Sequence, residues 1–248
     1  MVVVRKHLTN TRFRVVSNKK RFLVLSNKFL ETNSAAIRPV YSLFKTHLSA
    51  LRKLRRGQSI PVGEYNIAKE WVGNYSGRNN KALFRVSSER GQFFVKFGVG
   101  GHSARKYFQG YSIAKRYLES IGNKVCGFNV GVIEPHVVYE PHKSKLWDHS
   151  TRKGTGVKSV SRESFDILVT DFVPPDCVLL CDLEQQMPEP IWNESPQNRA
   201  VVGLNNELTK RGLTDIDTHN IFFNQKTNSL LLFDFGFNAK LLAMQNLI

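Results

Sequence analysis

The chain has 248 residues, of which 41% are hydrophobic and 11% aromatic, enough to bury one core or two small lobes. This composition is typical of a folded protein and excludes a disordered tail. Its 36 Lys and Arg residues outnumber 20 Asp and Glu residues, for a formal net charge of +16. Such an excess suggests a polyanionic partner, namely nucleic acid, an anionic membrane surface or a phosphorylated substrate.

Most of this charge lies in residues 1–60, which hold fourteen bases and one acid and so carry +13 of the +16. Residues 12–16 and 21–25 are predicted to form a β-hairpin around a polar turn. Apolar residues recur at helical spacing over 35–56, where basic residues fill much of the remainder. We interpret 1–60 as a basic leader, a hairpin plus an amphipathic helix. The helix either packs on its own domain or docks on anionic lipid or nucleic acid.

The N-terminus lacks the apolar core and cleavage site of a signal peptide, and no apolar run approaches the roughly 20 residues that span a bilayer. A cytoplasmic location is therefore expected, peripheral at the inner membrane if the leader binds lipid. The three cysteines form no CxxC pair, and we expect them to be free, buried thiols rather than zinc ligands.

Beyond residue 60 the pattern predicts strands, one helix, more strands and then helix, which is the signature of an α+β protein with two lobes. A β-rich segment is expected over 61–173, and a smaller, mostly helical one over 174–248. The predicted helices cover 103–120 and 198–211, and the predicted strands cover 82–86, 92–97, 130–139, 165–170 and 230–233.

The strongest chemical signal is a carboxylate and an amide five residues apart, Asp215 and Asn220, followed after a predicted hairpin by Asp234-Phe235-Gly236. Transfer of a phosphoryl group needs a carboxylate that orients the acceptor hydroxyl and accepts its proton. It also needs oxygen ligands for the Mg²⁺ that bridges the nucleotide phosphates. Asp215, Asn220 and Asp234 supply these groups in that order.

This arrangement resembles the catalytic and metal-binding loops of the protein-kinase-like superfamily. The resemblance covers about residues 66–240 and implies a bilobal kinase-like fold, with ATP and Mg²⁺ as cofactors. It implies that Asp215 is the catalytic base, and that Asn220 and Asp234 are the magnesium ligands.

Upstream segments match the same pattern in the same order. Lys96, in an apolar strand, resembles the lysine that neutralises the α- and β-phosphates, and a helix follows it. Glu119 is the only acid between Lys96 and the next strands, so it is the candidate there for the partner that holds this lysine.

Two further segments resemble parts of the nucleotide site. The stretch from Gly73 to Gly77 is a candidate glycine loop over the phosphates, although it lacks the full GxGxxG pattern. Residues 168–174 resemble the hinge between kinase lobes, where Thr170 stands at the back of the pocket. The backbone groups of Asp171 and Val173 are then expected to meet adenine.

The chain also departs from ordinary protein kinases. Thr214 occupies the position directly before the candidate catalytic aspartate, where ordinary protein kinases have an arginine. Asp217 replaces a common lysine, and either binds metal or caps the loop. His219 beside Asn220 is similar to the loop of bacterial kinases of lipopolysaccharide core sugars, and we expect it to order the loop. Only twelve residues follow Gly236, which leaves no room for an activation segment, so a minimal C-lobe is expected.

The leading hypothesis is therefore a kinase that moves the γ-phosphate of ATP to a hydroxyl acceptor, with a preference for a sugar of the lipopolysaccharide inner core. A compact protein Ser/Thr kinase is the alternative. A non-catalytic pseudokinase, which binds nucleic acid or membrane through its basic leader, is the third hypothesis.

Overall fold

The structure is a computed structural model, and it describes residues 13–18, 21–27, 50, 54–55, 57–69, 83–89, 91–97, 104–141, 167–234 and 236–238. The chain divides into two compact units. Within the described ranges, no helix is both long and apolar enough to cross a membrane.

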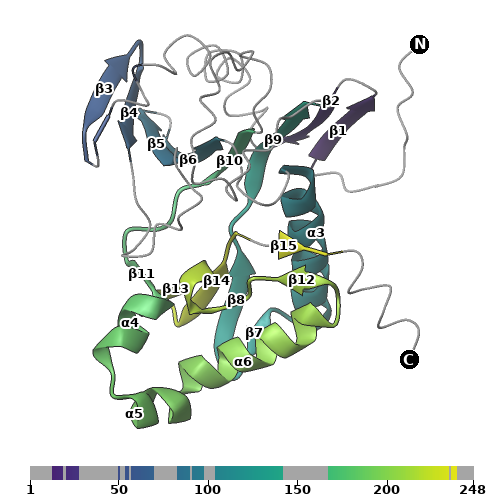
Figure 1. The fold of residues 1–248 in the computed structure, drawn as a ribbon, viewed down its shortest axis with the longest axis vertical. Helices are drawn as coiled ribbons and strands as arrows, with labels where there is room; N and C mark the ends of the chain where they lie inside the picture. Colours follow the sequence, from purple (N-terminus) through teal and green to yellow (C-terminus); the bar gives the residue numbers. More distant parts are fainter. Residues whose placement is uncertain are drawn as a thin grey trace, which may run out of the picture. The chain divides into compact units, whose positions relative to one another are not determined.

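The first unit is built on one eight-stranded sheet in which every neighbouring pair of strands is antiparallel (Figure 1). Its strands follow the spatial order β1 (Phe13–Asn18), β2 (Arg21–Ser26), β9 (Pro135–Pro141), β10 (Ile167–Asp171), β6 (Gly91–Phe97), β5 (Leu83–Ser88), β4 (Tyr65–Lys69) and β3 (Ser59–Val62).

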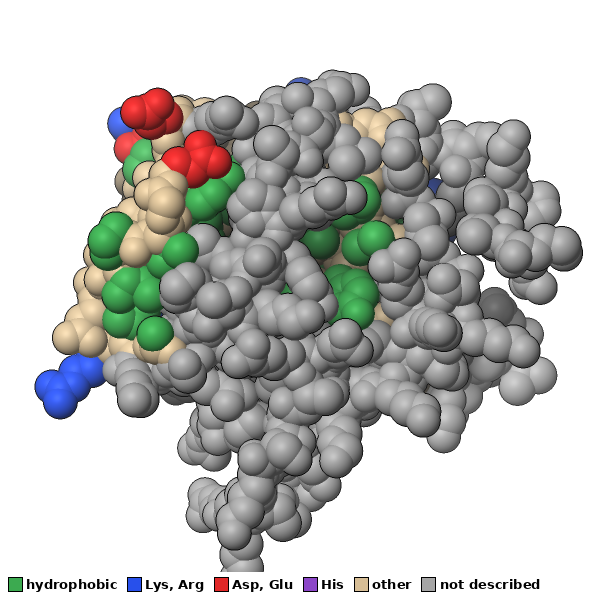
Figure 2. Space-filling view, turned by 90° about the horizontal axis from the view of Figure 1, so that it is seen from above, with side chains coloured by type: hydrophobic (Ala, Val, Ile, Leu, Met, Phe, Trp, Pro, Cys, Tyr) green, Lys and Arg blue, Asp and Glu red, His purple; other side chains and the backbone are tan. Residues whose placement is uncertain are grey.

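One face of this sheet carries an aliphatic and aromatic core that extends from β4 to β9. Side chains alternate between the two faces of a strand, so residues two apart share a face. The buried members of this core are Tyr65, Ile67, Phe84, Val86, Val95, Val137, Ile167 and Val169. Apolar side chains are visible at the surface as well, in Figure 2, on the side where Figure 1 draws β3, β4 and β5.

The predicted N-terminal hairpin is confirmed, because β1 pairs with β2 from Phe13–Ser26 to Asn18–Arg21. β2 also pairs with β9, so the hairpin extends the sheet of the first unit. Leu23 and Leu25 pack against the core of this sheet, and Val24 is 1% exposed. The predicted helix over 35–56 falls almost entirely outside the described residues.

The second unit contains a five-stranded sheet in the order β11 (Cys177–Leu179), β13 (Ile221–Asn224), β14 (Ser229–Leu232), β8 (Phe128–Val132) and β7 (Lys124–Val125). β14 pairs with β8 in parallel, and the other pairs are antiparallel. Gly131 allows the parallel pair to approach closely, since a Cβ atom there would lie 3.2 Å from the Leu231 side chain. A separate pair joins β12 (Leu213–Thr214) to β15 (Gly236–Phe237).

The helices of this unit are α3 (Ala104–Ser120), whose first residues belong to the first unit, α4 (Leu180–Gln186), α5 (Glu189–Glu194), α6 (Pro196–Thr209) and the 3₁₀ turn η1 (Thr218–Asn220). α3 confirms the helix predicted over 103–120 and buries a stripe of residues at helical spacing, namely Tyr107, Tyr111, Ala114 and Leu118. α6 confirms the helix predicted near 198–211. It begins where the Ser195 hydroxyl accepts the Asn198 amide, with Pro196 in the first turn.

The expectation of a mostly helical C-lobe is not confirmed. Between residues 177 and 237, the three consecutive helices α4–α6 lie in the chain between the short strand β11 and four more short strands, β12 to β15. The sequence pattern missed β11, β12 and β15 because strands of two or three residues are too short to show alternation. It also missed α4 and α5, which have seven and six residues. The division of the chain at residues 60 and 173 stays a prediction.

The cysteines are free, but the expectation that all three are buried is wrong. Cys126 is exposed in the turn between β7 and β8, where its φ is 48°. Cys177 is half-buried and Cys181 is buried. Burial and the nearby charges of Asp182 and Glu184 raise the pKa of the Cys181 thiol to about 11. Cys181 is therefore an inert core thiol.

The place of β2 inside the sheet predicts the effect of truncating Val24. We expect Val24→Ala to lower the free energy of unfolding by about 2 kcal/mol, since it removes two buried methyl groups from a close-packed site. Val178→Ala is the matched control because Val178 is 38% exposed. Chemical denaturation of both variants measures the difference. An equal, small effect of both substitutions would show that the hairpin contributes little to the folded unit.

Candidate active site

The hairpin of β13 and β14 positions two of the predicted site residues. Asn220 directly precedes β13, and Asp234 follows β14 by two residues. The pairing runs from Ile221–Leu232 to Asn224–Ser229, so both residues lie at the same end of the hairpin. The Phe233 amide donates to the Asn220 carbonyl oxygen at 3.0 Å and extends the pairing by one more bond.

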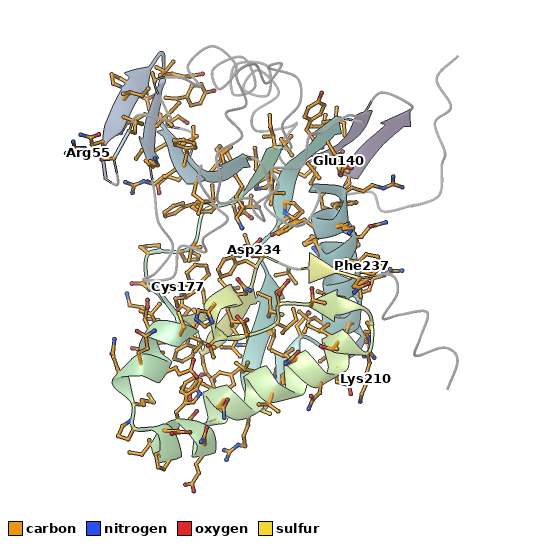
Figure 3. All side chains as sticks on the ribbon, viewed as in Figure 1. Arg55, Glu140, Cys177, Lys210, Asp234 and Phe237 are labelled. Carbon is orange, nitrogen blue, oxygen red and sulfur yellow. The ribbon has the colours of Figure 1, made fainter. Side chains whose placement is uncertain are left out.

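A second, shorter pairing brings Asp215 to the same place. β12 leads directly into Asp215, and its last residue, Thr214, pairs with Gly236 of β15. The Asn220 side-chain amide donates to the Asp215 carbonyl oxygen at 2.8 Å. Figure 3 labels Asp234, which follows β14, and Phe237, which ends β15. The structure thus brings Asp215, Asn220 and Asp234 together, which their sequence spacing had only indicated.

Both aspartates have a backbone conformation that L-residues rarely adopt. The φ angle is 65° at Asp215 and 57° at Asp234. A non-glycine residue in this region costs about 1–3 kcal/mol and persists only where its surroundings enforce it. The other described non-glycine residues with positive φ, Asn123, Cys126 and Asn228, lie in turns between regular elements. Two strained aspartates at one location therefore point to a functional site.

The two carboxylates have different surroundings. Asp215 is exposed, and one of its carboxylate oxygens accepts the Thr214 hydroxyl at 3.0 Å. Asp234 is half-buried beside Tyr107 of α3, whose side chain is 1% exposed. The Asp234 amide donates to the Tyr107 phenol oxygen, while burial and the Asp234 charge together raise the pKa of Tyr107 above its ordinary value.

Tyr107 was missed by the sequence analysis. Its spacing to Tyr111 and Leu118 indicates a buried helix face and nothing more specific. Its contact with Asp234 joins residues more than a hundred positions apart, and no local pattern carries that information.

The loop between Asp215 and Asn220 is held from two directions. The Asp217 carboxylate accepts the His219 amide at 2.9 Å and so caps η1. Asp217 was expected either to bind metal or to cap the loop, and in the structure it caps the loop. Thr218, at the base of η1, is buried and donates its hydroxyl to Glu184 of α4 at 2.5 Å. These bonds fix the loop whose ends are the candidate base and the candidate magnesium ligand.

The site residues predicted from the first unit share one sheet face. Lys96 of β6 is directly opposite Leu168 of β10, and Thr170 is opposite Phe94. Opposite residues and residues two apart lie on the same face. Lys96 and Thr170 therefore both point away from the core of Val95 and Val169, yet they are only 4% and 5% exposed.

The remaining candidates are more scattered. Asp171 ends β10, and its carboxylate contacts His136. Val173, where the second unit begins, packs against the cluster of Leu179, Phe222 and Phe233. Glu119 is exposed near the end of α3, and its pairing with Lys96 stays a prediction because the two residues belong to different units. Gly73 and Gly77 lie outside the described residues.

The donor atoms of the second unit fit Mg²⁺, which prefers oxygen ligands. Because the Asn220 side-chain nitrogen donates to Asp215, its Oδ1 oxygen is the atom left to ligate. Asp234 adds a carboxylate from the other end of the hairpin. Within the described ranges, no group of three or more His, Cys, Asp or Glu side chains could hold a metal ion.

Comparisons with family models and with curated protein sequences found no match. Among solved structures, the chain is similar to the kinase PK-1 of Cydia pomonella granulovirus, with a TM-score of 0.38 and 14% identity over 81% of this chain and 55% of that one. Vaccinia related kinase 3 gives a TM-score of 0.35 and 10% identity over 79% of this chain and 55% of that one.

The BubR1 kinase domain gives a TM-score of 0.37 and 12% identity over 85% of this chain and 62% of that one. The chain thus spans less than two thirds of the length of each of these three proteins. Similarities at this level do not identify a shared fold. The functional assignment therefore depends on the local geometry of the site.

The contact between Tyr107 and Asp234 yields a prediction. We expect Tyr107→Phe to lower the free energy of unfolding by about 1–2 kcal/mol, since the Asp234 amide loses its buried acceptor. Tyr111→Phe is the matched control, because Tyr111 is equally buried on the same helix and accepts a bond from Lys115, 2.9 Å away. The Lys115 ammonium is only part-buried, so this loss is expected to stay within about 0.5 kcal/mol. Urea denaturation compares the two, and equal losses would contradict a supporting role for Tyr107.

Proposed function

We propose that the chain is an ATP- and Mg²⁺-dependent phosphotransferase that moves the γ-phosphate of ATP to a hydroxyl acceptor. The observation that carries this proposal is the convergence of Asp215, Asn220 and Asp234 at one end of a hairpin, with both aspartates in strained conformations. Phosphoryl transfer requires little covalent chemistry from the protein and depends on positioning and charge. A rigid, oxygen-rich site suits that requirement.

In this proposal Asn220 and Asp234 hold the metal, whose charge neutralises the phosphates. Asp215 orients the acceptor hydroxyl and takes its proton as the acceptor oxygen bonds to the γ-phosphorus and the bond to ADP breaks. The exposure of Asp215 suits an incoming acceptor, and the Thr214 hydroxyl holds one of its oxygens.

The role proposed for Lys96 is to bind the α- and β-phosphates. Its burial supports a specific role, since a lysine is almost never fully buried unless its charge is compensated. Thr170 lies on the same sheet face and would line the pocket behind the base. Glu119, Gly73 and Gly77 keep the roles that the resemblance implies.

The acceptor is a separate part of the proposal. A sugar of the lipopolysaccharide inner core is our first candidate, on the resemblance of the loop from Asp215 to Asn220. A protein Ser/Thr hydroxyl is the second. The pseudokinase hypothesis, in which residues 1–60 bind nucleic acid or membrane, shares the fold but not the transfer. We propose a cytoplasmic location, peripheral at the inner membrane if the basic leader binds anionic lipid.

Transfer from labelled ATP tests the proposal. We expect the wild type, with Mg²⁺, to transfer label to an acceptor in bacterial envelope or cytosolic extracts. Asp215→Asn should reduce transfer about 10²–10⁴-fold with ATP binding retained, because only proton transfer and orientation are lost. Asp234→Ala should reduce it to background.

Asp176→Asn is the matched control, because Asp176 is an exposed aspartate of the same unit that pairs with Lys226 at 2.9 Å. Label in glycolipid favours the sugar acceptor, and label in protein favours the protein kinase. ATP binding without any transfer would contradict the enzyme hypothesis and favour the pseudokinase. Equal loss of transfer in Asp176→Asn and Asp215→Asn would show that the effect is not local to the site.

A further inference from the structure

A buried histidine links three strands of the first unit. His136 of β9 is 2% exposed, and both of its ring nitrogens are engaged. Its Nδ1 atom lies 2.9 Å from the hydroxyl of Ser26, the last residue of β2. Its Nε2 atom lies 2.6 Å from the carboxylate of Asp171, the last residue of β10. The edge of the His136 ring also meets Phe93, with centroids 5.8 Å apart.

The backbone explains how His136 reaches both neighbours. Val137 is opposite Val169, while Pro135 is opposite Thr170, so the register shifts by one residue between them. His136 is therefore the extra residue of a β-bulge on β9. A bulge redirects a side chain that regular pleating would turn elsewhere, and bulges are common beside active sites.

The chemistry of the three side chains determines which atom donates and which accepts in each of the two hydrogen bonds. An ionised carboxylate only accepts, so Nε2 carries the proton that is shared with Asp171. In the neutral ring Nδ1 is then an acceptor, and the Ser26 hydroxyl donates to it. Serine, histidine and aspartate side chains linked by hydrogen bonds also form the catalytic triad of hydrolases. Here, however, Ser26 is 0% exposed and no substrate reaches it. The chain of bonds thus serves to hold Asp171.

Asp171 is held at a second point as well. Its carbonyl oxygen accepts the Thr170 hydroxyl at 3.0 Å. The next residue, Phe172, packs on Phe94 at a centroid distance of 6.4 Å and lies 5.8 Å from the Arg85 guanidinium. The second unit then begins at Val173. The main chain at residues 170–172 is thus held by the Asp171 carboxylate, the Asp171 carbonyl oxygen and the Phe172 ring, just before it leaves the sheet.

We infer that His136 is a positioning residue that, with Ser26, fixes the main chain at Asp171 for recognition of the adenine base of ATP. This inference rests on the proposed function, in which the backbone groups of Asp171 receive adenine. It extends the nucleotide site to the N-terminal hairpin, because Ser26 ends β2. Neither Ser26 nor His136 touches the base; both act through Asp171.

Substitutions of His136 separate this role from a general contribution to folding. His136→Asn keeps a polar group near Ser26 but is too short to reach Asp171. We expect it to raise the Kd and the KM for ATP about tenfold, the effect of one lost bond to a charged group. The value of kcat should change little, because Asp215, Asn220 and Asp234 are untouched. His136→Gln places an amide nitrogen near the former Nε2 position and should restore much of the affinity.

Hydrogen exchange at the amides of residues 170–173 provides a readout that needs no ligand. Exchange there should be faster in His136→Asn and Asp171→Asn than in the wild type, and nearer to the wild-type rate in His136→Gln. Ser87→Ala is the matched control for Ser26→Ala, since the exposed Ser87 hydroxyl also bonds a neighbouring strand, at Asn66. We expect Ser26→Ala alone to accelerate exchange and to weaken ATP binding.

Three outcomes would overturn different statements. Unchanged exchange and unchanged ATP affinity in all His136 variants that fold would refute the positioning role. If the wild type binds no ATP, the proposed function fails, and the adenine part of this inference fails with it. The exchange rates then still decide whether His136 fixes the chain at Asp171. A kcat loss equal to the KM change would also contradict the inference, because it would place His136 in the transfer step.

Discussion

The antiparallel register of β13 and β14 is the constraint on which the candidate active site depends. Asn220 and Asp234 are fourteen positions apart, and only this register places them at one end of the hairpin. A slip of one residue would turn every side chain of a strand to the opposite face. The buried residues Ile221, Leu230 and Leu232 oppose such a slip, as does the stacking of Phe222 on Phe233 with ring centroids 4.6 Å apart.

The same hairpin explains how two strained aspartates are tolerated. Asp234 follows Phe233, whose ring is stacked and whose amide is bonded to Asn220, and precedes the Gly236 that pairs with Thr214. The backbone at Asp234 is therefore fixed on both sides, and Tyr107 accepts its amide. Asp215 is fixed by Thr214 on one side and by the Asn220 side chain on the other. Packing elsewhere in the unit offsets a local cost of about 1–3 kcal/mol per residue.

The sequence allowed prediction of those parts of the fold that local pattern controls. The hairpin of β1 and β2, the helix α3 and the strands around Lys96 are long enough to show their period, and they were expected within a few residues of their bounds. The β-bulge at His136 and the contact of Tyr107 with Asp234 were not. Each depends on residues of different strands or helices: Ser26 and His136, for example, are 110 positions apart. Such contacts have no period that a single sequence displays.

The different surroundings of the two aspartates give the last argument about the chemistry. A carboxylate that binds a cation is a weaker base, so phosphoryl transfer is better served by two carboxylates, one for the acceptor proton and one for the metal. Asp215 is exposed on a capped loop, where an acceptor can approach it. Asp234 is half-buried against a tyrosine that also binds its amide. Exposure suits the group that meets a variable substrate, and burial suits the group that holds an ion in one place. The division of roles implied by the resemblance is thus also the one that these physical surroundings favour.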